Sequence, residues 1–106
     1  MRPIPIKLRE QIASDPFMLT CIYQSPGAPN HNCRGRITWE HSFTYSGRQI
    51  NEWWSIVPCC ENHNSGPEMV KEYNQYRSII RLDINEVITK YPNKNWRVIK
   101  DYLCKK

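Results

Sequence analysis

The chain has 106 residues, 40% of them hydrophobic, and a formal net charge of +5 at pH 7. A chain this short is expected to form one domain. A domain of this size buries only a modest share of its surface and often needs extra stabilisation, for example by a bound metal. No apolar run approaches the roughly 20 residues of a membrane span, and residues 1–7 lack the apolar core of a secretory signal. We therefore expect a cytoplasmic protein with no membrane partner.

The first half of the chain predicts a helix at residues 6–14 and a loop at residues 24–32. A strand is expected at residues 37–42, a turn at 45–49 and a second strand at 53–57. Pro5 suits the first turn of the helix, and Asp15-Pro16 should end it. The first strand is rich in β-forming residues, and Pro58 should end the second. Three apolar residues after the helix are expected in the core, namely Phe17, Met18 and Leu19.

The second half predicts three helices. Residues 65–68, Ser-Gly-Pro-Glu, have capping-box spacing and precede an apolar stripe that runs from Met69 to Ile80. Asp83 and Glu86 can cap a second helix, and a last short helix is expected around four apolar residues, Trp96, Ile99, Tyr102 and Leu103. We expect a single domain over residues 1–106, with its core at about 17–82 and a C-terminal helical extension at about 83–106.

The cysteines and the charges predict a metal and, weakly, a polyanionic partner. Five cysteines are an odd number, and without a secretory signal they are not expected to form a disulfide framework. Residues 67–106 hold nine Lys or Arg against five Asp or Glu, whereas residues 1–66 hold six against five. A basic excess of this size suits nucleic acid, but many other soluble proteins share it.

Cys60 and His63 form one ligand pair for a structural zinc ion, which takes four Cys or His ligands in a tetrahedron. The other pair is expected from Cys21 and Cys33, although eleven residues separate them and the Pro- and Gly-containing loop between them must fold back. The predicted set is therefore Cys21, Cys33, Cys60 and His63. His31 and Cys59 remain alternatives, and Cys59 faces away if Cys60 faces the metal.

Glu40 and His41 carry groups that suit phosphodiester hydrolysis. A divalent metal neutralises the phosphate and stabilises the leaving oxygen, and a histidine, with an ordinary pKa of about 6.5, can take a proton from water. Consecutive strand residues point to opposite faces, so these two can serve one site only if the strand ends or bends there. The Ser-Phe-Thr-Tyr-Ser-Gly run that follows makes such an end plausible.

The pair Glu40-His41, followed by Cys60-x-x-His63-Asn64, resembles the HNH nuclease family. The resemblance covers residues 21–64 and implies an α+β fold, in which flanking helices surround a small zinc-stapled ββα-metal core. It also implies that Glu40 and Asn64 bind a catalytic Mg²⁺ or Mn²⁺ ion and that His41 is the general base.

In this family a residue of the intervening loop, often Asn, orients the catalytic histidine. The corresponding role in this chain falls either to Asn51, in a longer loop, or to a backbone carbonyl near Ser55. We prefer Asn51 slightly. Asn51 is otherwise expected to be a loop residue that bonds its own backbone.

Basic residues near the proposed centre are expected to contact phosphates, namely Arg34, Arg36 and Arg48. Three others share a predicted helix that could lie along a duplex, namely Lys71, Arg77 and Arg81. The resemblance thus implies an endonuclease that hydrolyses DNA phosphodiester bonds with weak sequence preference, in a bacterial or phage-infected cell. A protein partner could supply targeting. The alternative is a non-catalytic zinc-binding module that binds nucleic acid or protein and requires the cysteines but not Glu40, His41 and Asn64 together.

Overall fold

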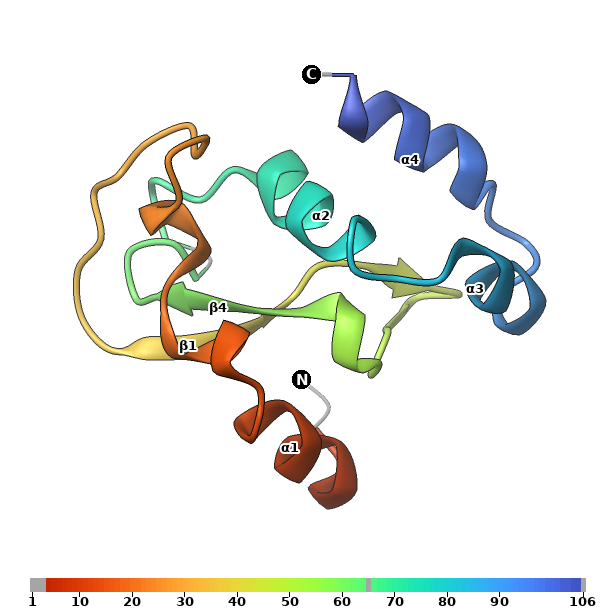
Figure 1. The fold of residues 1–106 in the computed structure, drawn as a ribbon, viewed down its shortest axis with the longest axis horizontal. Coiled ribbons are helices and arrows are strands. Elements are labelled where there is room, and N and C mark those ends of the chain that lie inside the picture. The colour runs from red at the N-terminus through yellow and green to blue at the C-terminus, as the bar shows by residue number, and fades with distance from the viewer. Residues whose placement is uncertain (1–3, 65, 106) are drawn as a thin grey trace.

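The computed structural model describes residues 4–64 and 66–105. At its centre, β1 (Ile37–His41) and β4 (Ile56–Cys60) pair antiparallel in a two-stranded sheet. In the view of Figure 1, α2 (Lys71–Ile79) lies above this pair and α1 (Ile6–Ala13) below it. The molecule is therefore a small α+β fold, with helices packed around a minimal sheet.

The strand register separates two ends of the sheet. Ile37 at the start of β1 pairs with Cys60, and His41 at its end pairs with Ile56. At about 3.3 Å per residue, the two ends of β1 lie roughly 13 Å apart. Every second residue of a strand lies on the same face, so Thr38 and Glu40 lie on one face of β1. The cysteine end and the His41 end can thus carry separate sites.

The second central strand differs from the prediction at both ends. Trp53–Ser55 forms a 3₁₀ turn, and β4 then runs through Pro58 to Cys60. A proline is tolerated because each strand of a two-stranded sheet is an edge strand, on which the missing N–H can face away from the partner. The predicted strand over 53–57 is therefore wrong in its bounds, and both Cys59 and Cys60 belong to the sheet.

A small hairpin replaces the turn that was expected at residues 45–49. β2 (Thr44–Tyr45) pairs with β3 (Arg48–Gln49), and Ser46 and Gly47 form its tip. Both tip residues have positive φ, 52° at Ser46 and 78° at Gly47. Two successive residues of this kind match a tight turn between antiparallel strands, and glycine adopts the conformation without strain.

The N-terminal helix agrees with its prediction, but the segment after it does so only in part. α1 ends at Ala13, and the carboxylate of Asp15 then accepts a hydrogen bond from the N–H of Phe17, which starts a 3₁₀ turn over Pro16–Leu19. Met18 is buried as expected, whereas Leu19 is 73% exposed. A 3₁₀ turn rotates each residue about 120° from the last, so three consecutive apolar residues cannot all face the core.

Helix α2 begins later than the capping-box spacing predicts. Its N-cap is Val70, which makes no side-chain cap hydrogen bond, and Ser65 lies outside the described residues. The two later helices are capped as side-chain chemistry favours. Asp83 caps α3 (Ile84–Lys90), and Asn95 caps α4 (Trp96–Cys104) by accepting from the N–H of Val98.

The C-terminal helices complete a hydrophobic cluster with the loop that follows β1. The cluster brings together eight buried side chains: Phe43, Ile50, Trp54, Ile79, Leu82, Val87, Trp96 and Leu103. The rings of Trp54 and Trp96 meet edge to face at 5.7 Å. Truncating a buried Trp typically costs about 3–5 kcal/mol, so this contact anchors the end of the chain to the core. Among the described residues, we find no helix with the length and apolarity that crossing a membrane requires.

Candidate metal centre and cleft

Four predicted zinc ligands meet at the cysteine end of the sheet: Cys21, Cys33, Cys60 and His63. Their ligand atoms all lie within 4.8 Å of one another. The Nδ1 atom of His63 is 3.8 Å from the Sγ atoms of Cys21 and Cys33, and 3.1 Å from that of Cys60. Sulfur and nitrogen ligands of a tetrahedral zinc are about 3.6 Å apart, so the cluster could hold a metal such as zinc.

Neighbouring side chains orient His63 for this cluster. Its Nε2 donates to the Oδ1 of Asn30 at 2.6 Å, which leaves the lone pair of Nδ1 directed to the sulfurs. The ring of Tyr23 stacks on the imidazole at 3.8 Å, with 2° between the planes. Burial lowers the pKa of His63, against an opposing effect of Glu68. The neutral imidazole that a metal requires is therefore favoured.

The surroundings favour ionisation of the Cys60 thiol over that of the Cys33 thiol. Burial alone raises the pKa of Cys60, but the N–H groups of Arg34, His63 and Asn62 donate toward its sulfur and hold the pKa below its ordinary value. Burial, and then the neighbouring sulfurs of Cys21 and Cys60, raise the pKa of Cys33 to about 12. Thiolates this close repel one another, and a cation between them removes that cost.

The loop before β1 needs a glycine to bring Arg34 against Cys60. Gly35 has a φ of +80°, in the left-handed region that glycine adopts freely. A Cβ atom at this position would also lie 2.9 Å from the Cβ of Glu61 and closer still to its carboxylate. Gly35 therefore permits the turn from which the N–H of Arg34 reaches the sulfur of Cys60 at 3.3 Å.

The two alternative zinc ligands have other positions. The Nδ1 of His31 lies 2.8 Å from the backbone oxygen of Tyr23, and Cys59 is buried in the strand beside Cys60. Neither belongs to the ligand cluster within residues 4–64 and 66–105. Cys104 is exposed near the end of α4.

At the other end of the sheet, His41 is held by Asn51. The Nε2 of His41 and the Oδ1 of Asn51 are 2.7 Å apart. An amide oxygen accepts at this distance, so Nε2 donates, and in the neutral imidazole Nδ1 then carries the lone pair. The carbonyl of Ser55, which was the alternative partner, instead accepts from the N–H of Ser42 at 2.8 Å.

Glu40 and His41 both line a cleft of about 220 Å³. β1 ends at His41, and this end lets two consecutive residues contribute to one cavity. The other wall comes from α2 and from the segment before α4, and includes Lys71 and Lys94. Gln49 lines the cleft too, and its buried Oε1 has no hydrogen-bond partner within the described part of the chain.

Asn64 lies beside the same strand but is not one of the residues that line this cleft. Its Nδ2 donates to the Oγ1 of Thr38, which lies on the same face of β1 as Glu40 and about 7 Å from it along the strand. The bond to Thr38 uses Nδ2 and not Oδ1, the atom that a metal would bind.

Two of the three predicted phosphate contacts lie at the opposite end of β1 from His41. Arg34, Arg36 and Arg48 are all exposed. The first two lie at the cysteine end of β1, where Arg36 is 3.6 Å from Glu61, and Arg48 belongs to the small hairpin. Lys71 and Lys94 line the cleft. Lys71 belongs to the helix that was expected to lie along a duplex, whereas Lys94 was not among the predicted contacts. Fifty-two residues separate His41 from Lys94 in the chain, so no local spacing could connect them.

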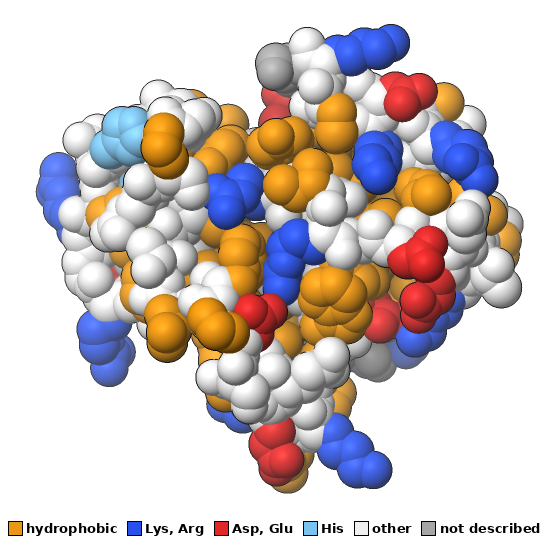
Figure 2. All heavy atoms as spheres, viewed as in Figure 1, with side chains coloured by type: hydrophobic (Ala, Val, Ile, Leu, Met, Phe, Trp, Pro, Cys, Tyr) orange, Lys and Arg blue, Asp and Glu red, His pale blue; other side chains and the backbone are white. Residues whose placement is uncertain are grey.

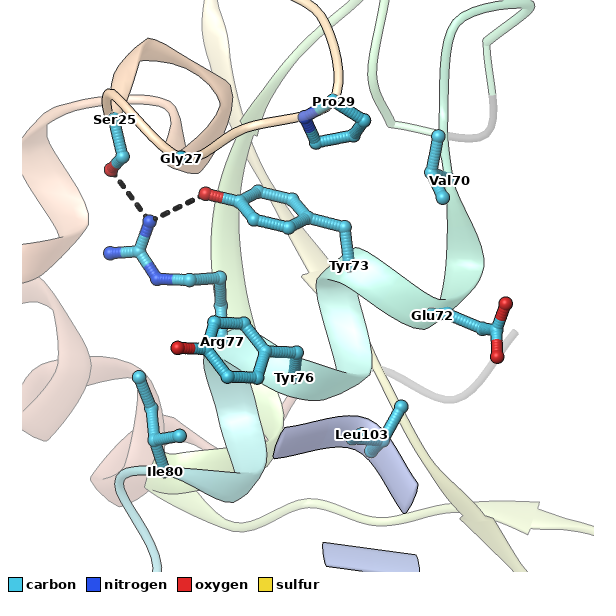
Figure 3. A pocket seen from close by; sticks show the side chains of 10 residues that line it. All are labelled: Ser25, Gly27, Pro29, Val70, Glu72, Tyr73, Tyr76, Arg77, Ile80 and Leu103. Carbon is cyan, nitrogen blue, oxygen red and sulfur yellow. Dashed lines mark hydrogen bonds between the residues drawn. The ribbon is translucent and has the colours of Figure 1, made fainter. Parts of the chain in front are cut away.

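Arg77 and Arg81, which were expected to lie along a duplex, both make contacts within the fold. The Nη1 of Arg77 donates to the Oγ of Ser25 at 2.6 Å and to the hydroxyl of Tyr73 at 3.0 Å (Figure 3). Arg81, beyond the end of α2, pairs with Asp15 at 2.9 Å and lies over the ring of Phe17. This side of α2 faces the N-terminal loops, so both guanidinium groups are used inside the fold.

A larger cavity of about 770 Å³ lies on that side of α2, away from His41 (Figure 3). Its lining residues include Glu72, Arg77 and Leu103 but neither His nor Cys, so it offers no imidazole of the kind found in the cleft. On the face of the molecule in Figure 2, Lys and Arg side chains are scattered among acidic and hydrophobic ones rather than gathered into one patch.

No known family model, curated protein or solved structure matches this chain. The chemistry of the metal centre and of the cleft therefore has to be argued from the geometry of this chain itself.

Proposed function

We propose that this protein is a metal-dependent endonuclease of the HNH type that hydrolyses DNA phosphodiester bonds. The observation that supports it most is the 2.7 Å contact between His41 and Asn51, in a cleft that Glu40 also lines. A base that removes a proton from water needs a defined tautomer, a fixed orientation and an opening to the reactant. Asn51 provides the first two for His41, and the cleft provides the third.

Glu40 and Asn64 are the residues that would hold the catalytic Mg²⁺ or Mn²⁺ ion. Both carry the hard oxygen donors that such ions prefer, and both lie along the same face of β1. When bound, the ion supplies charge neutralisation at the phosphate and at the leaving oxygen. His41 takes the proton of the attacking water on Nδ1, and Asn51 stabilises the imidazolium that forms by accepting from Nε2.

The cysteine cluster has a different role in this proposal. Three thiolates and one imidazole complete a tetrahedron around zinc and leave no position for water. The zinc would therefore hold β4, the loop before β1 and the N-terminal segment together, and the reaction would take place at the other end of the sheet.

The experiment that tests this proposal is cleavage of supercoiled plasmid in Mg²⁺ or Mn²⁺, with bound zinc counted on the same samples. Glu40→Gln keeps the shape of the side chain and removes its charge, so we expect loss of cleavage with unchanged zinc content. Glu86→Gln, at an exposed position on α3, is the matched control and should cleave like the wild type. Equal rates for both variants would contradict the proposed role of Glu40.

The second candidate is a non-catalytic zinc-stapled module that binds nucleic acid or protein. The closed Cys₃His set favours it, because such a set stabilises a fold without requiring chemistry elsewhere. This candidate predicts no cleavage by the wild type at one zinc per chain, and no distinction between Glu40→Gln and Glu86→Gln.

A further inference from the structure

A second hollow of about 340 Å³ adjoins the cleft at His41. The two share three lining residues, Phe43, Gln75 and Lys94. The shared residues place the second hollow beside the cleft, on the side of α4. A molecule that reacts at His41 can therefore extend into the second hollow without leaving the protein surface.

The cleft and the second hollow differ in chemistry. Around His41 the walls carry Glu40, Lys71 and Lys94. On α4 the walls are mainly apolar, and two of their side chains are large and exposed, Val98 at 60% and Tyr102 at 55%. Exposed apolar side chains beside a polar cleft are typical of a site that binds the apolar part of a ligand.

The two lysines lie where a phosphate would be held. Lys71 is the exposed first residue of α2, and Lys94 precedes α4, so they come from separate elements on the same cleft. The Nζ of Lys94 lies 3.4 Å from the carbonyl oxygen of Thr44 and 5.8 Å from the centre of the Trp96 ring, both of them long contacts. An ammonium group bound this weakly can turn toward a phosphate, and a charge-assisted bond to phosphate would be shorter and stronger.

We propose that the substrate is DNA with an unpaired nucleotide next to the cleaved bond, whose base lies in the apolar groove on α4 while Lys71 and Lys94 hold the adjacent phosphate. The inference rests on the proposed nuclease function. A base inside a duplex is stacked and paired and cannot enter such a groove, whereas an unpaired base offers a flat apolar face to an aromatic side chain. Tyr102 is that side chain, and the groove selects for single-stranded or flapped DNA.

The test compares cleavage of a single strand, a flap and a full duplex of one sequence. We expect the wild type to cleave the single strand and the flap at least about tenfold faster than the duplex, as loss of one base–aromatic contact is worth roughly that factor. Tyr102→Ala should lower the single-strand-to-duplex ratio by a similar factor, mainly through KM. Leu19→Ala, which removes a 73% exposed apolar side chain from another surface, should leave that ratio unchanged.

Two results would overturn the inference. One is duplex cleavage as fast as single-strand cleavage. The other is an equal ratio in Tyr102→Ala and Leu19→Ala, which would be the result if the groove served a protein partner. If the wild type cleaves none of the substrates, the proposed function fails instead. In that case, the affinity of the same variants for a fluorescent single strand and for a duplex tests the groove separately. A preference for the single strand that depends on Tyr102 supports the inference, and equal affinity for the two overturns it.

Discussion

The two ends of β1 carry sites of different kinds, a closed cluster of ligand atoms at one end and an open cleft at the other. At the Ile37 end, four ligand atoms lie within 4.8 Å of one another, and Asn30, Tyr23 and backbone N–H groups surround them. At the His41 end, one oriented imidazole and one carboxylate line an open cleft. A closed ligand set leaves no position for a reactant, whereas a cleft leaves one. Under the proposed function, one short strand carries a stabilising site at one end and a reactive site at the other.

The largest expected effect is loss of the fold when the cysteine end is broken. Zinc binding by small structural sites is worth about 10–16 kcal/mol, which is as large as the typical stability of about 5–15 kcal/mol of a whole domain. Cys60→Ser, or removal of zinc by a chelator, should therefore unfold the chain, as measured by circular dichroism with zinc counted. Cys104→Ser, at an exposed cysteine outside the cluster, is the matched control. An unchanged melting temperature without zinc would show that the cluster is not structural.

The second-largest effect is expected from a substitution at the His41 end of β1, and it should leave the cysteine end unchanged. His41→Ala removes the proposed base, and loss of general base catalysis typically costs about 10²–10⁴ in rate. We expect this loss at unchanged zinc content and melting temperature, because His41 is half-buried and lies outside the ligand cluster. His31→Ala removes a histidine outside both sites and should keep its activity. If His41→Ala also lost its zinc, the two ends would not be independent.

A smaller loss is expected when the orientation of His41 is relaxed. Asn51→Ala removes the acceptor 2.7 Å from Nε2, and misplacing a catalytic group by about 1 Å can cost on the order of 10² in rate. Asn51→Asp retains an oxygen acceptor and should recover most of the rate. The pH–rate profile should shift in the Ala variant and much less in Asn93→Ala, an exposed control. A purely structural role would lower stability in Asn51→Ala without moving that profile.

The smallest effect is expected from a substitution beside the cysteine cluster. Asn30→Ala removes the partner of the Nε2 atom of His63, and loss of such an outer contact typically weakens metal affinity about 10–100-fold. Competition with a chelator measures this change. With zinc saturating, cleavage should match that of the wild type, because the cleft is unaltered. A cleavage defect that excess zinc does not repair would contradict the separation of the two ends.

Residue types predicted the Cys and His cluster well because thiol and imidazole groups have few other reasons to be close together. The spacing of Cys60 and His63 supplied one ligand pair, and the four predicted ligands do meet. The long loop that carries Cys33 could not be positioned from spacing alone. Its path depends on Gly35, whose left-handed backbone brings Arg34 against Cys60.

The rest of the fold was harder to predict because it depends on packing between distant segments. The strand at 53–57 was misplaced because Pro58 was taken as a breaker, and its tolerance depends on the sheet having two strands. Leu19 was placed in the core from its apolarity alone, although a 3₁₀ turn directs it to solvent. Lys94 lines the cleft in a segment that is held by contacts with distant residues, such as the packing of Trp96 on Trp54.

The most direct measurement of the central claim, that the His41 end carries the chemistry, is chemical rescue of a His41→Gly variant. The variant opens space beside Asn51 and Glu40 for a free imidazole molecule. At one zinc per chain and in Mg²⁺, the proposal predicts that His41→Gly does not cleave supercoiled plasmid and that added imidazole restores part of the wild-type rate. A His41→Gly variant that cleaves at the wild-type rate without imidazole would contradict the assignment of His41 as the base.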